Sequence, residues 1–496
     1  MKRLLCAFLM LLLMPVAGAL ACTQNEIDVN GDDTQCETAK FTITTTELTA
    51  DTTFAFYMSA RGTFYVDWGD GTVDTITRTD TDETLYDHTY STAGVKTIRF
   101  GGVATGYTTS RYNNTIRFGY SDTADSATPT LISAINGSLG EIFSVQANMV
   151  PAFAKSFSRT RITEIPENLF SGIRASTPYM FQSTFAYTSA LTSIPANLFA
   201  DITVPRQGLF NSAFMGSAVK TIPPTLFHSI NGSAAAMFQN TFRSASITSI
   251  PAELFETINK PANNLFNATF MGCTRLTAIP NNLFKNITGV AANQFYYTFY
   301  RCGATGYIPP SLFAGLNNSG LYTTTMMTEI FYNTNLDTTC PAGTVQFVTG
   351  YENYWNGHVS CVDENLVCSA GEYLPAHGYE CTKCPENNYC VGGTYTYSEN
   401  TTYGATQCPN SWYAPRGMSS ADQCGRILHI GENVVYLRNV KKTTPSLNVR
   451  VDGYTFYGNM TTADVPMNAN TNVSMKVEYE NQTWSIYDDT VTINQE

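Results

Sequence analysis

The stretch FNATFMGCTRLTAIPNNLF (residues 266–284) decides the fold, because its pattern occurs six times at intervals of 28 or 29 residues. Every copy contains Ile-Pro-x-x-Leu-Phe preceded by Phe-x-x-x-Phe. The prolines are Pro166, Pro195, Pro223, Pro251, Pro280 and Pro309. The phenylalanine pairs are Phe153/Phe157, Phe181/Phe185, Phe210/Phe214, Phe238/Phe242, Phe266/Phe270 and Phe295/Phe299. A fixed period of this length predicts a stacked solenoid, since one unit cannot bury its own apolar face.

Each copy also suggests local structure. Leu-Thr-x-Ile is short and partly alternating, which predicts a strand that ends at the proline because proline lacks an N–H. Pro-x-x-Leu-Phe-x-x-Ile is spaced for a short helix or 3₁₀ segment. Phe-x-x-x-Phe places two rings on one face if helical, and predicts core ladders along the stack. The last copy departs from the pattern, with Thr305 aligned to the Leu column.

The copies resemble bacterial surface leucine-rich repeats of the BspA-like type, most clearly at residues 270–279. The resemblance implies cell-surface binding or adhesion, with a solenoid over 126–338 as the ligand surface. Specificity is expected at variable polar positions such as 174–179 and 260–264. Cys273 and Cys302 should lie on adjacent turns, where they either pair or remain buried thiols.

The amino terminus predicts a secretory signal peptide over 1–21, with a basic start, an apolar run and a small-residue cleavage site before Cys22. Lipid attachment to Cys22 is the alternative. Ala19 stands where lipid-modified precursors usually carry leucine, and lipidation would leave an odd thiol. Without Cys6 of the signal, 12 of the 13 cysteines remain, an even set suited to disulfides.

The charge balance narrows the class of partner. The formal net charge is −12, and removal of Lys2 and Arg3 makes the mature chain more acidic. An acidic chain lacks the basic face that nucleic acid or anionic lipid requires. We therefore expect no nucleic-acid partner, and no transmembrane segment after the signal peptide, since no later apolar run is long enough.

The segment 22–125 reads as a β domain. Strands are expected near residues 41–46, 54–57, 63–68 and 95–100 from their β-branched and aromatic content. The turn Trp68-Gly-Asp-Gly-Thr72 and the run Tyr86-Asp-His-Thr-Tyr90 resemble the PKD domain, which implies an immunoglobulin-like β-sandwich without catalysis. A second TIRFG segment (115–119) either extends this sheet or begins the repeat stack.

Candidate polar groups in this domain have two interpretations each. His88 is expected to be a structural hydrogen-bonding residue rather than a catalytic base. Asp67, Asp70 and Asp87 could gather around calcium but are expected to cap turns. The acidic run 28–33 lacks the glycine and glutamate of a calcium loop, so we interpret it as a polar turn, with a Cys22–Cys36 disulfide as its candidate closure.

The segment 339–424 holds eight cysteines, a density typical of a disulfide scaffold. A zinc or redox site is the less favoured interpretation of Cys381-Thr-Lys-Cys384. The spacing resembles small cysteine-rich modules of growth-factor and tumour-necrosis-factor receptors, which implies a stiff stalk. Cys340–Cys361 and Cys368–Cys381 are favoured as nearest partners. The disulfide candidates of the whole chain are Cys22, Cys36, Cys340, Cys361, Cys368, Cys381, Cys384, Cys390, Cys408 and Cys424.

Residues 425–496 alternate at period two and predict a small antiparallel β domain, with hairpin turns at Asp452-Gly453 and Glu480-Asn481. The whole chain is therefore expected to be mainly β.

The motifs searched for catalysis and phosphate binding are missing from the sequence, and its five histidines are scattered among modules. We expect a non-enzymatic secreted or cell-surface binding protein with no catalytic, cofactor or metal residues and with an extracellular protein or glycan as partner. The alternatives are a structural spacer or accessory module for an enzyme and, more remotely, a secreted hydrolase with paired carboxylates.

Overall fold

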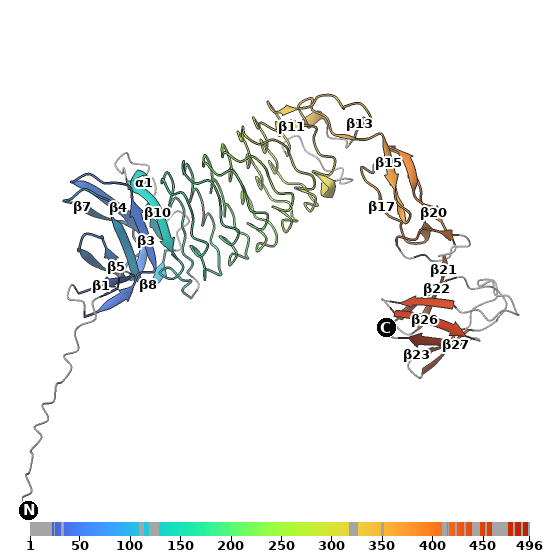
Figure 1. Ribbon diagram of the computed structural model, residues 1–496, viewed down its shortest axis with the longest axis horizontal. Coiled ribbons are helices and arrows are strands. Elements are labelled where there is room, and N and C mark those ends of the chain that lie inside the picture. The colour runs from blue at the N-terminus through green and yellow to red at the C-terminus, as the bar shows by residue number, and fades with distance from the viewer. Residues whose placement is uncertain are drawn as a thin grey trace, which may run out of the picture. The chain divides into compact units, whose positions relative to one another are not determined.

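The computed structural model describes residues 22–494 apart from 24, 31–33, 109–113, 119–127, 148, 317–325, 349–351, 409–413, 415, 422–423, 431–432, 439–446, 452–453, 459–474, 480–481 and 488–489. The predicted signal peptide and the two predicted C-terminal hairpin turns lie outside the described residues. The described chain is mainly β, as expected, with one four-residue helix, α1 (Thr128–Leu131), and two 3₁₀ turns (Figure 1). None of its described helices is long and apolar enough to cross a bilayer.

The chain divides into two compact units. One holds the described residues up to Gly306 together with 311–336 and 353–356, and the other holds 307–310, 337–352 and the residues from 357 on. The first unit contains a two-sheet β domain and the repeats. The second contains the cysteine-rich segment and the C-terminal strands.

Two antiparallel sheets begin the first unit. Their strands are β3 (Phe41–Thr45), β4 (Thr52–Met58), β5 (Ala60–Asp67), β6 (Val73–Arg78), β7 (Thr84–Tyr90), β8 (Thr97–Tyr107), β9 (Ile116–Arg117) and β10 (Ile132–Gly137). The order is β10-β3-β8-β5-β6 in one sheet and β7-β4-β9 in the other. The hairpin of β1 (Glu26–Asp28) and β2 (Cys36–Thr38) precedes them, and the Cys22–Cys36 disulfide ties it to the chain start.

The core between the sheets is aromatic. In β5 every second side chain is buried, as a strand with one solvent face requires. Phe56 of β4 meets Phe100 of β8 edge-on at 5.3 Å between ring centroids, and Phe118 contacts both rings at 5.9 and 5.5 Å. The strands predicted near residues 41, 54, 63 and 95 are confirmed as β3, β4, β5 and β8, within three residues at their starts.

The β domain is joined directly to the first repeat. The TIRFG segment does both things considered for it: β9 pairs with β4, while Thr115 and Phe118 donate backbone hydrogen bonds to Ala152 and Ser156 of the first coil. Phe118 also stacks on Phe157 at 5.7 Å. The β domain thus covers one end of the repeats, where an open end would expose unpaired backbone and apolar surface.

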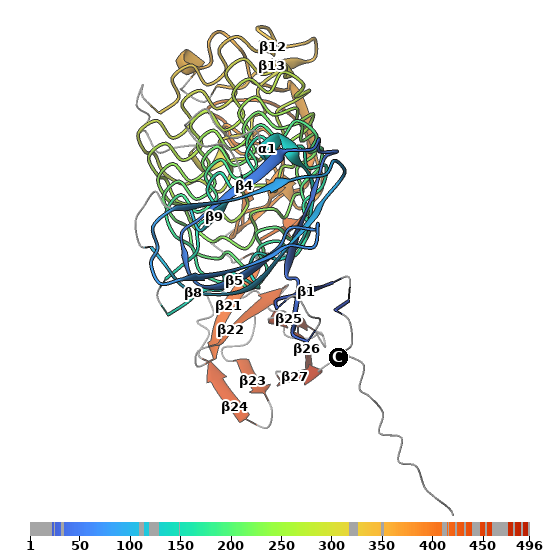
Figure 2. The ribbon, with the colours of Figure 1, turned by 90° about the vertical axis from the view of Figure 1, so that its left-hand side faces the viewer.

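Successive repeats lie coil upon coil, as Figures 1 and 2 show. The backbone bonds between coils come mainly from the Phe-x-x-x-Phe segments, where alternate N–H groups donate to carbonyls of the next copy. The bonds of one interface, at N···O distances of 2.6–3.0 Å, are Tyr179 to Gln207, Phe181 to Leu209, Ser183 to Asn211, Phe185 to Ala213 and Tyr187 to Met215.

These segments are not helical. Every fourth residue has a left-handed backbone, with φ of 60° at Tyr179, 54° at Ser183 and 59° at Tyr187. The intervening amides close turns onto carbonyls three residues back, such as Thr184 onto Phe181 at 3.3 Å. A left-handed residue costs about 1–2 kcal/mol, and this cost is offset because its N–H, freed from local turns, bonds the next coil.

The predicted aromatic ladders are present, and all their rings are buried. Neighbouring rings within a ladder are 5.5–6.3 Å apart and within 15° of parallel. A third ladder comes from the Leu-Phe pairs. The ladders are Phe153-181-210-238-266-295, Phe157-185-214-242-270-299-331 and Phe170-199-227-255-284-313.

The prediction of a strand at Leu-Thr-x-Ile is wrong for the described copies, with one exception. In the last copy β11 (Thr305–Gly306) pairs in parallel with β12 (Asn335–Leu336). Elsewhere single bonds join the coils there, such as Thr277 N to Thr248 O at 3.1 Å. The step between the second Phe and the Leu column varies by one residue, and the following proline has no N–H, so a ladder cannot continue.

The Pro-x-x-Leu-Phe segment forms consecutive i→i+3 turns instead of a regular helix. The proline carbonyl accepts the leucine N–H in four copies, for example Pro166 from Leu169 at 3.1 Å. Only the last described copy tightens into a 3₁₀ turn, η1 (Ala314–Leu316). The second such turn in the chain, η2 (Glu352–Tyr354), lies outside the repeats.

The alignment of Thr305 to the Leu column is also wrong. Ala304 is fully buried in that column, whereas Thr305 is exposed and bonds the carbonyl of Thr277. The last copy has a shorter step before the column, and its extra residue is absorbed later at Gly306, where φ is +82°. An alignment that counts the same number of residues back from the proline in every copy therefore places the Leu column of the last copy one residue too late.

Buried threonine hydroxyls hydrogen-bond neighbouring coils to each other in the interior of the stack. In copies two, four, five and six the residue before the second Phe is a fully buried threonine, which donates to the carbonyl of the first Phe in the preceding coil at 2.8–2.9 Å. Cys273 and Cys302 are free buried thiols whose Sγ atoms contact the carbonyls of Phe242 and Phe270. Of the two possibilities left open, the structure has the thiols.

The second unit opens with short hairpins held by disulfides. Its strand pairs are β13 (Thr344–Gln346) with β14 (Cys361–Asp363), β15 (Asn365–Cys368) with β19 (Gly393–Thr396), β16 (Glu372–Tyr373) with β17 (Thr382–Lys383), and β18 (Asn388–Tyr389) with β20 (Thr406–Gln407). The disulfides are Cys340–Cys361, Cys368–Cys381, Cys384–Cys390 and Cys408–Cys424. The first two are the pairs that sequence proximity favours.

A seven-stranded sheet follows, in the order β21-β22-β25-β26-β27-β23-β24. Its strands are β21 (Gly425–Ile430), β22 (Asn433–Arg438), β23 (Leu447–Val451), β24 (Tyr454–Gly458), β25 (Met475–Tyr479), β26 (Gln482–Tyr487) and β27 (Thr490–Asn494). The sheet is not wholly antiparallel as predicted, because β23 and β27 pair in parallel. Period-two alternation identifies strands but carries no information on partner direction.

One interior position breaks the repeat chemistry. The residue before the first Phe is Met180, Leu209, Met237 and Leu265 in successive copies, but Gln294 in the sixth, and all are fully buried. The Gln294 amide nitrogen and oxygen have no hydrogen-bond partner among the described residues. A buried unpaired amide destabilises the fold.

We therefore expect Gln294→Leu to raise the local unfolding free energy by about 1–3 kcal/mol. The measurement is hydrogen exchange of peptides covering 290–300. Leu265→Gln, the reverse change one copy earlier, should accelerate exchange locally. Faster exchange in Gln294→Leu would show that the amide has a stabilising partner.

The free thiols give a chemical test of the stack. Burial raises the pKa of the Cys273 thiol well above its ordinary value, which suppresses the reactive thiolate. Iodoacetamide should leave the folded chain unmodified and should alkylate two cysteines, Cys273 and Cys302, in guanidinium chloride without reductant. Mass spectrometry reads the result, and failure to alkylate the denatured chain would mean that these two cysteines are oxidised.

Candidate functional site

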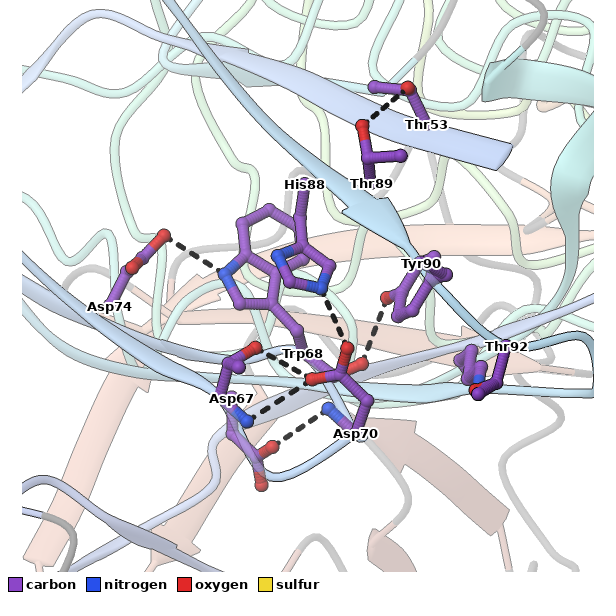
Figure 3. Close-up of polar contacts among 12 residues, drawn as sticks. Thr53, Asp67, Trp68, Asp70, Asp74, His88, Thr89, Tyr90 and Thr92 are labelled. Carbon is purple, nitrogen blue, oxygen red and sulfur yellow. Dashed lines mark hydrogen bonds and ion pairs between the residues drawn. The ribbon is translucent and has the colours of Figure 1, made fainter. Parts of the chain in front are cut away.

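The turn between β5 and β6 carries a cluster of polar contacts (Figure 3). The Trp68 indole N–H donates to Asp74 Oδ2 at 2.9 Å, and the Trp68 carbonyl accepts the Tyr90 hydroxyl at 2.8 Å. Trp68 is fully buried. Gly69 and Gly71 have φ of +77° and +94°, a backbone that favours glycine. These contacts fix the turn against β7.

His88 completes the cluster. Its ring stacks on Trp68 at 4.9 Å and lies edge-on to Tyr90 at 4.8 Å, and its Nε2 lies 2.8 Å from Asp70 Oδ2. The other Asp70 oxygen accepts the N–H and hydroxyl of Thr72 at 3.1 and 2.6 Å. Each polar atom named here is engaged in holding the turn, so the geometry matches the structural interpretation of His88.

Two pKa values reflect this packing. Burial alone would raise the pKa of Asp70, but hydrogen bonds from Thr72 and His88 outweigh it and hold that pKa below its ordinary value. Burial, with the nearby charges of Asp70 and Asp67, raises the pKa of Tyr90 well above its ordinary value. At neutral pH Asp70 is therefore ionised and Tyr90 is protonated.

The three aspartates considered for calcium do not come together as one ligand set. Asp67 accepts the Gly69 N–H at 2.8 Å and pairs with Arg99 at 2.9 Å. Asp87 is exposed and neighbours His88 on β7, so the two side chains leave opposite faces of the strand. Across the described residues, no group of three or more His, Cys, Asp or Glu could hold a metal ion.

A polar cleft of about 500 Å³ lies between the β1–β2 hairpin and the β5–β6 turn. Glu26, Asp28, Asp67 and Arg99 supply its charged lining, and Thr23 and Asn30 add polar groups. The acidic run expected to form a turn contributes to this cleft, although its residues 31–33 lie outside the described residues. The lining contains no aromatic ring and no histidine.

A second candidate lies on the outer surface of the last coils. Tyr296, Tyr297, Tyr300 and Tyr332 form what we call the tyrosine cluster. Ring centroids are 3.9 Å apart for Tyr296 and Tyr297, 4.9 Å for Tyr297 and Tyr300, and 5.5 Å for the stacked pair of Tyr300 and Tyr332. The Arg301 guanidinium lies 5.1 Å from the Tyr300 ring centroid. Hydrogen bonding with Tyr296 raises the pKa of Tyr297 to about 12, so the Tyr297 hydroxyl is neutral at physiological pH.

A row of amides occupies the same outer position as Tyr296 in earlier copies. We call Gln182, Asn211, Gln239 and Asn267 the amide column. Each directly follows a buried first Phe and is half-buried itself. The Asn211 side-chain N–H donates to Gln239 Oε1 at 3.1 Å, which links neighbouring coils.

Sequence reasoning missed the tyrosine cluster and named 174–179 and 260–264 instead, segments in which Arg174, Pro178, Lys260, Pro261 and Asn263 are exposed. The missed signal was tyrosine at positions where other copies carry amides, small residues, methionine or a basic residue. The repeat prolines and the paired cysteines lie in the turns and disulfides described above.

A comparison of the chain with protein-family models, with curated proteins and with solved structures gives no match.

We expect Asp70→Asn to lower the free energy of unfolding of the β domain by about 1 kcal/mol at neutral pH, because it removes the charge from three hydrogen bonds. Since the folded-state pKa of Asp70 lies below its unfolded value, this contribution is complete above about pH 4 and is lost as pH falls through the folded-state pKa. Hydrogen exchange of peptides covering 63–78 at neutral and acid pH tests this. Asp87→Asn, on the exposed face of β7, is the matched control and should leave exchange unchanged at both pH values. A difference between Asp70→Asn and the unmodified chain that does not depend on pH would contradict a stabilising role for the Asp70 charge.

Proposed function

We propose that the chain is a non-enzymatic secreted or cell-surface binding protein that uses its repeats as a ligand surface. Five disulfides among the described residues suit an oxidising, extracellular setting. The proposal takes the β domain as a PKD-like, immunoglobulin-like sandwich and the repeats as a solenoid of the BspA-like leucine-rich type. The resemblance of both motif sets supports this interpretation.

The observation that carries the proposal is that core positions and outer positions are separate within each coil. The large apolar side chains of the repeat pattern are buried, and the backbone bonds between coils are internal to the stack. The outer positions therefore vary without affecting the core, as between Gln239, Asn267 and Tyr296. Repeat proteins bind through such extended, variable surfaces.

The principal experiment treats intact source cells with protease and analyses the released peptides and the culture medium. We expect peptides of this chain to be released without lysis, or the chain itself to be in the medium, while a cytoplasmic marker stays protected. Recovery only after lysis would contradict the proposed location. Saturable binding of the purified chain to an array of extracellular proteins and glycans would then distinguish a binding protein from a spacer, which would bind none.

A further inference from the structure

The outer face of the Phe-x-x-x-Phe segments is one continuous strip along the stack. The first Phe of each copy points into the core, so the next residue points outward from the same position on every coil. This strip passes from the amide column (Gln182, Asn211, Gln239, Asn267) to Tyr296 and the rest of the tyrosine cluster. The underlying rings of the first-Phe ladder are 5.5–5.8 Å apart from Phe181 to Phe295, which sets the rise from one outer side chain to the next.

The tyrosine end of the strip has the character of a binding platform. Tyr332 is 47% exposed, and its ring continues the stack of Tyr300. Large aromatic rings are normally covered in a protein interior, so four contiguous tyrosines at a surface mark an interaction site. Each ring offers an apolar face and a hydroxyl at its edge, a combination suited to ligands that are apolar on one side and polar at the rim.

The chemistry of the whole strip narrows the ligand. Amide side chains both donate and accept hydrogen bonds, and they carry no charge. The ionic groups at the cluster are of opposite sign, Arg301 and Glu329, so the platform has no excess charge that would favour an anion. The acidic chain as a whole disfavours nucleic acid and other polyanions.

We propose that the tyrosine cluster and the amide column together form a binding strip for a neutral polysaccharide chain that runs along the stack. Pyranose rings place C–H groups against aromatic faces and direct hydroxyls to the sides, where amides and phenol hydroxyls bond them. The rise of one coil is comparable with one sugar unit of an extended chain, so successive coils meet successive sugars. This inference rests on the proposed binding function and specifies its ligand class and site.

The test uses the full secreted chain and calorimetric titration with cellohexaose, xylohexaose, mannohexaose and maltohexaose. We expect at least one to bind, and the double variant Tyr300→Ala/Tyr332→Ala to weaken that binding at least tenfold. Tyr300→Phe/Tyr332→Phe keeps the ring faces and should lose less. Thr248→Ala/Thr277→Ala changes exposed residues of the Leu-Thr-x-Ile segments, away from the tyrosine cluster and the amide column, and should bind as the unmodified chain does. Unchanged protection in hydrogen exchange shows that each variant is folded.

Two outcomes would overturn the inference. One is binding of the hexasaccharides that survives in Tyr300→Ala/Tyr332→Ala, which would place the glycan elsewhere. The other is failure of every neutral hexasaccharide to bind. If the chain then still binds an extracellular protein on the array, the proposed function stands and only the glycan assignment fails. If it binds nothing on the array, both fail.

Discussion

The backbone hydrogen bonds between Phe-x-x-x-Phe segments are the interaction on which the rest of the repeat structure depends. They fix the rise from coil to coil, and that rise brings three phenylalanine ladders into stacking distance. The bonds need N–H groups that are free of local turns, and the left-handed residues supply part of them beside the Phe residues. Glycine or asparagine at several left-handed positions, such as Gly208, Gly216, Asn240 and Asn264, reduces the strain.

The same constraint separates stability from recognition. The two Phe residues and the residue before the second Phe face the core, while the residue after the first Phe lies on the outer side, so the core repeats strictly while the outer face does not. Tyr296 replaces an amide without changing the Phe295 ladder beneath it. Each coil needs a neighbour that supplies backbone bonds and ring contacts. For the first coil, β9 and Phe118 supply the contacts that another coil would give. The β domain and the stack therefore share one continuous core.

Much of this could be predicted from sequence where the signal was local and repeated. The buried Phe columns and the stacking followed from the period, and the β3, β4, β5 and β8 strands from β-branched and aromatic content. Predictions failed where spacing varied by one residue, as at Thr305, or where two backbone geometries suit the same side-chain pattern, as in Phe-x-x-x-Phe. The Trp68 cluster was foreseen as structural, because a tight turn after an apolar strand demands polar caps, but its Asp70–His88 bond depends on two strands meeting.

The sequence by itself determined which residues are interior, because burial of apolar side chains imposes its period on the chain. The number of cysteines also favoured disulfide bonding, and five disulfides are present among the described residues. Only the tertiary structure decided how the backbone bonds from coil to coil, that Cys273 and Cys302 stay reduced, and that four tyrosines gather at one surface. Such features depend on how close residues that are far apart in the chain come in space. Composition and motif spacing contain no information on these spatial distances.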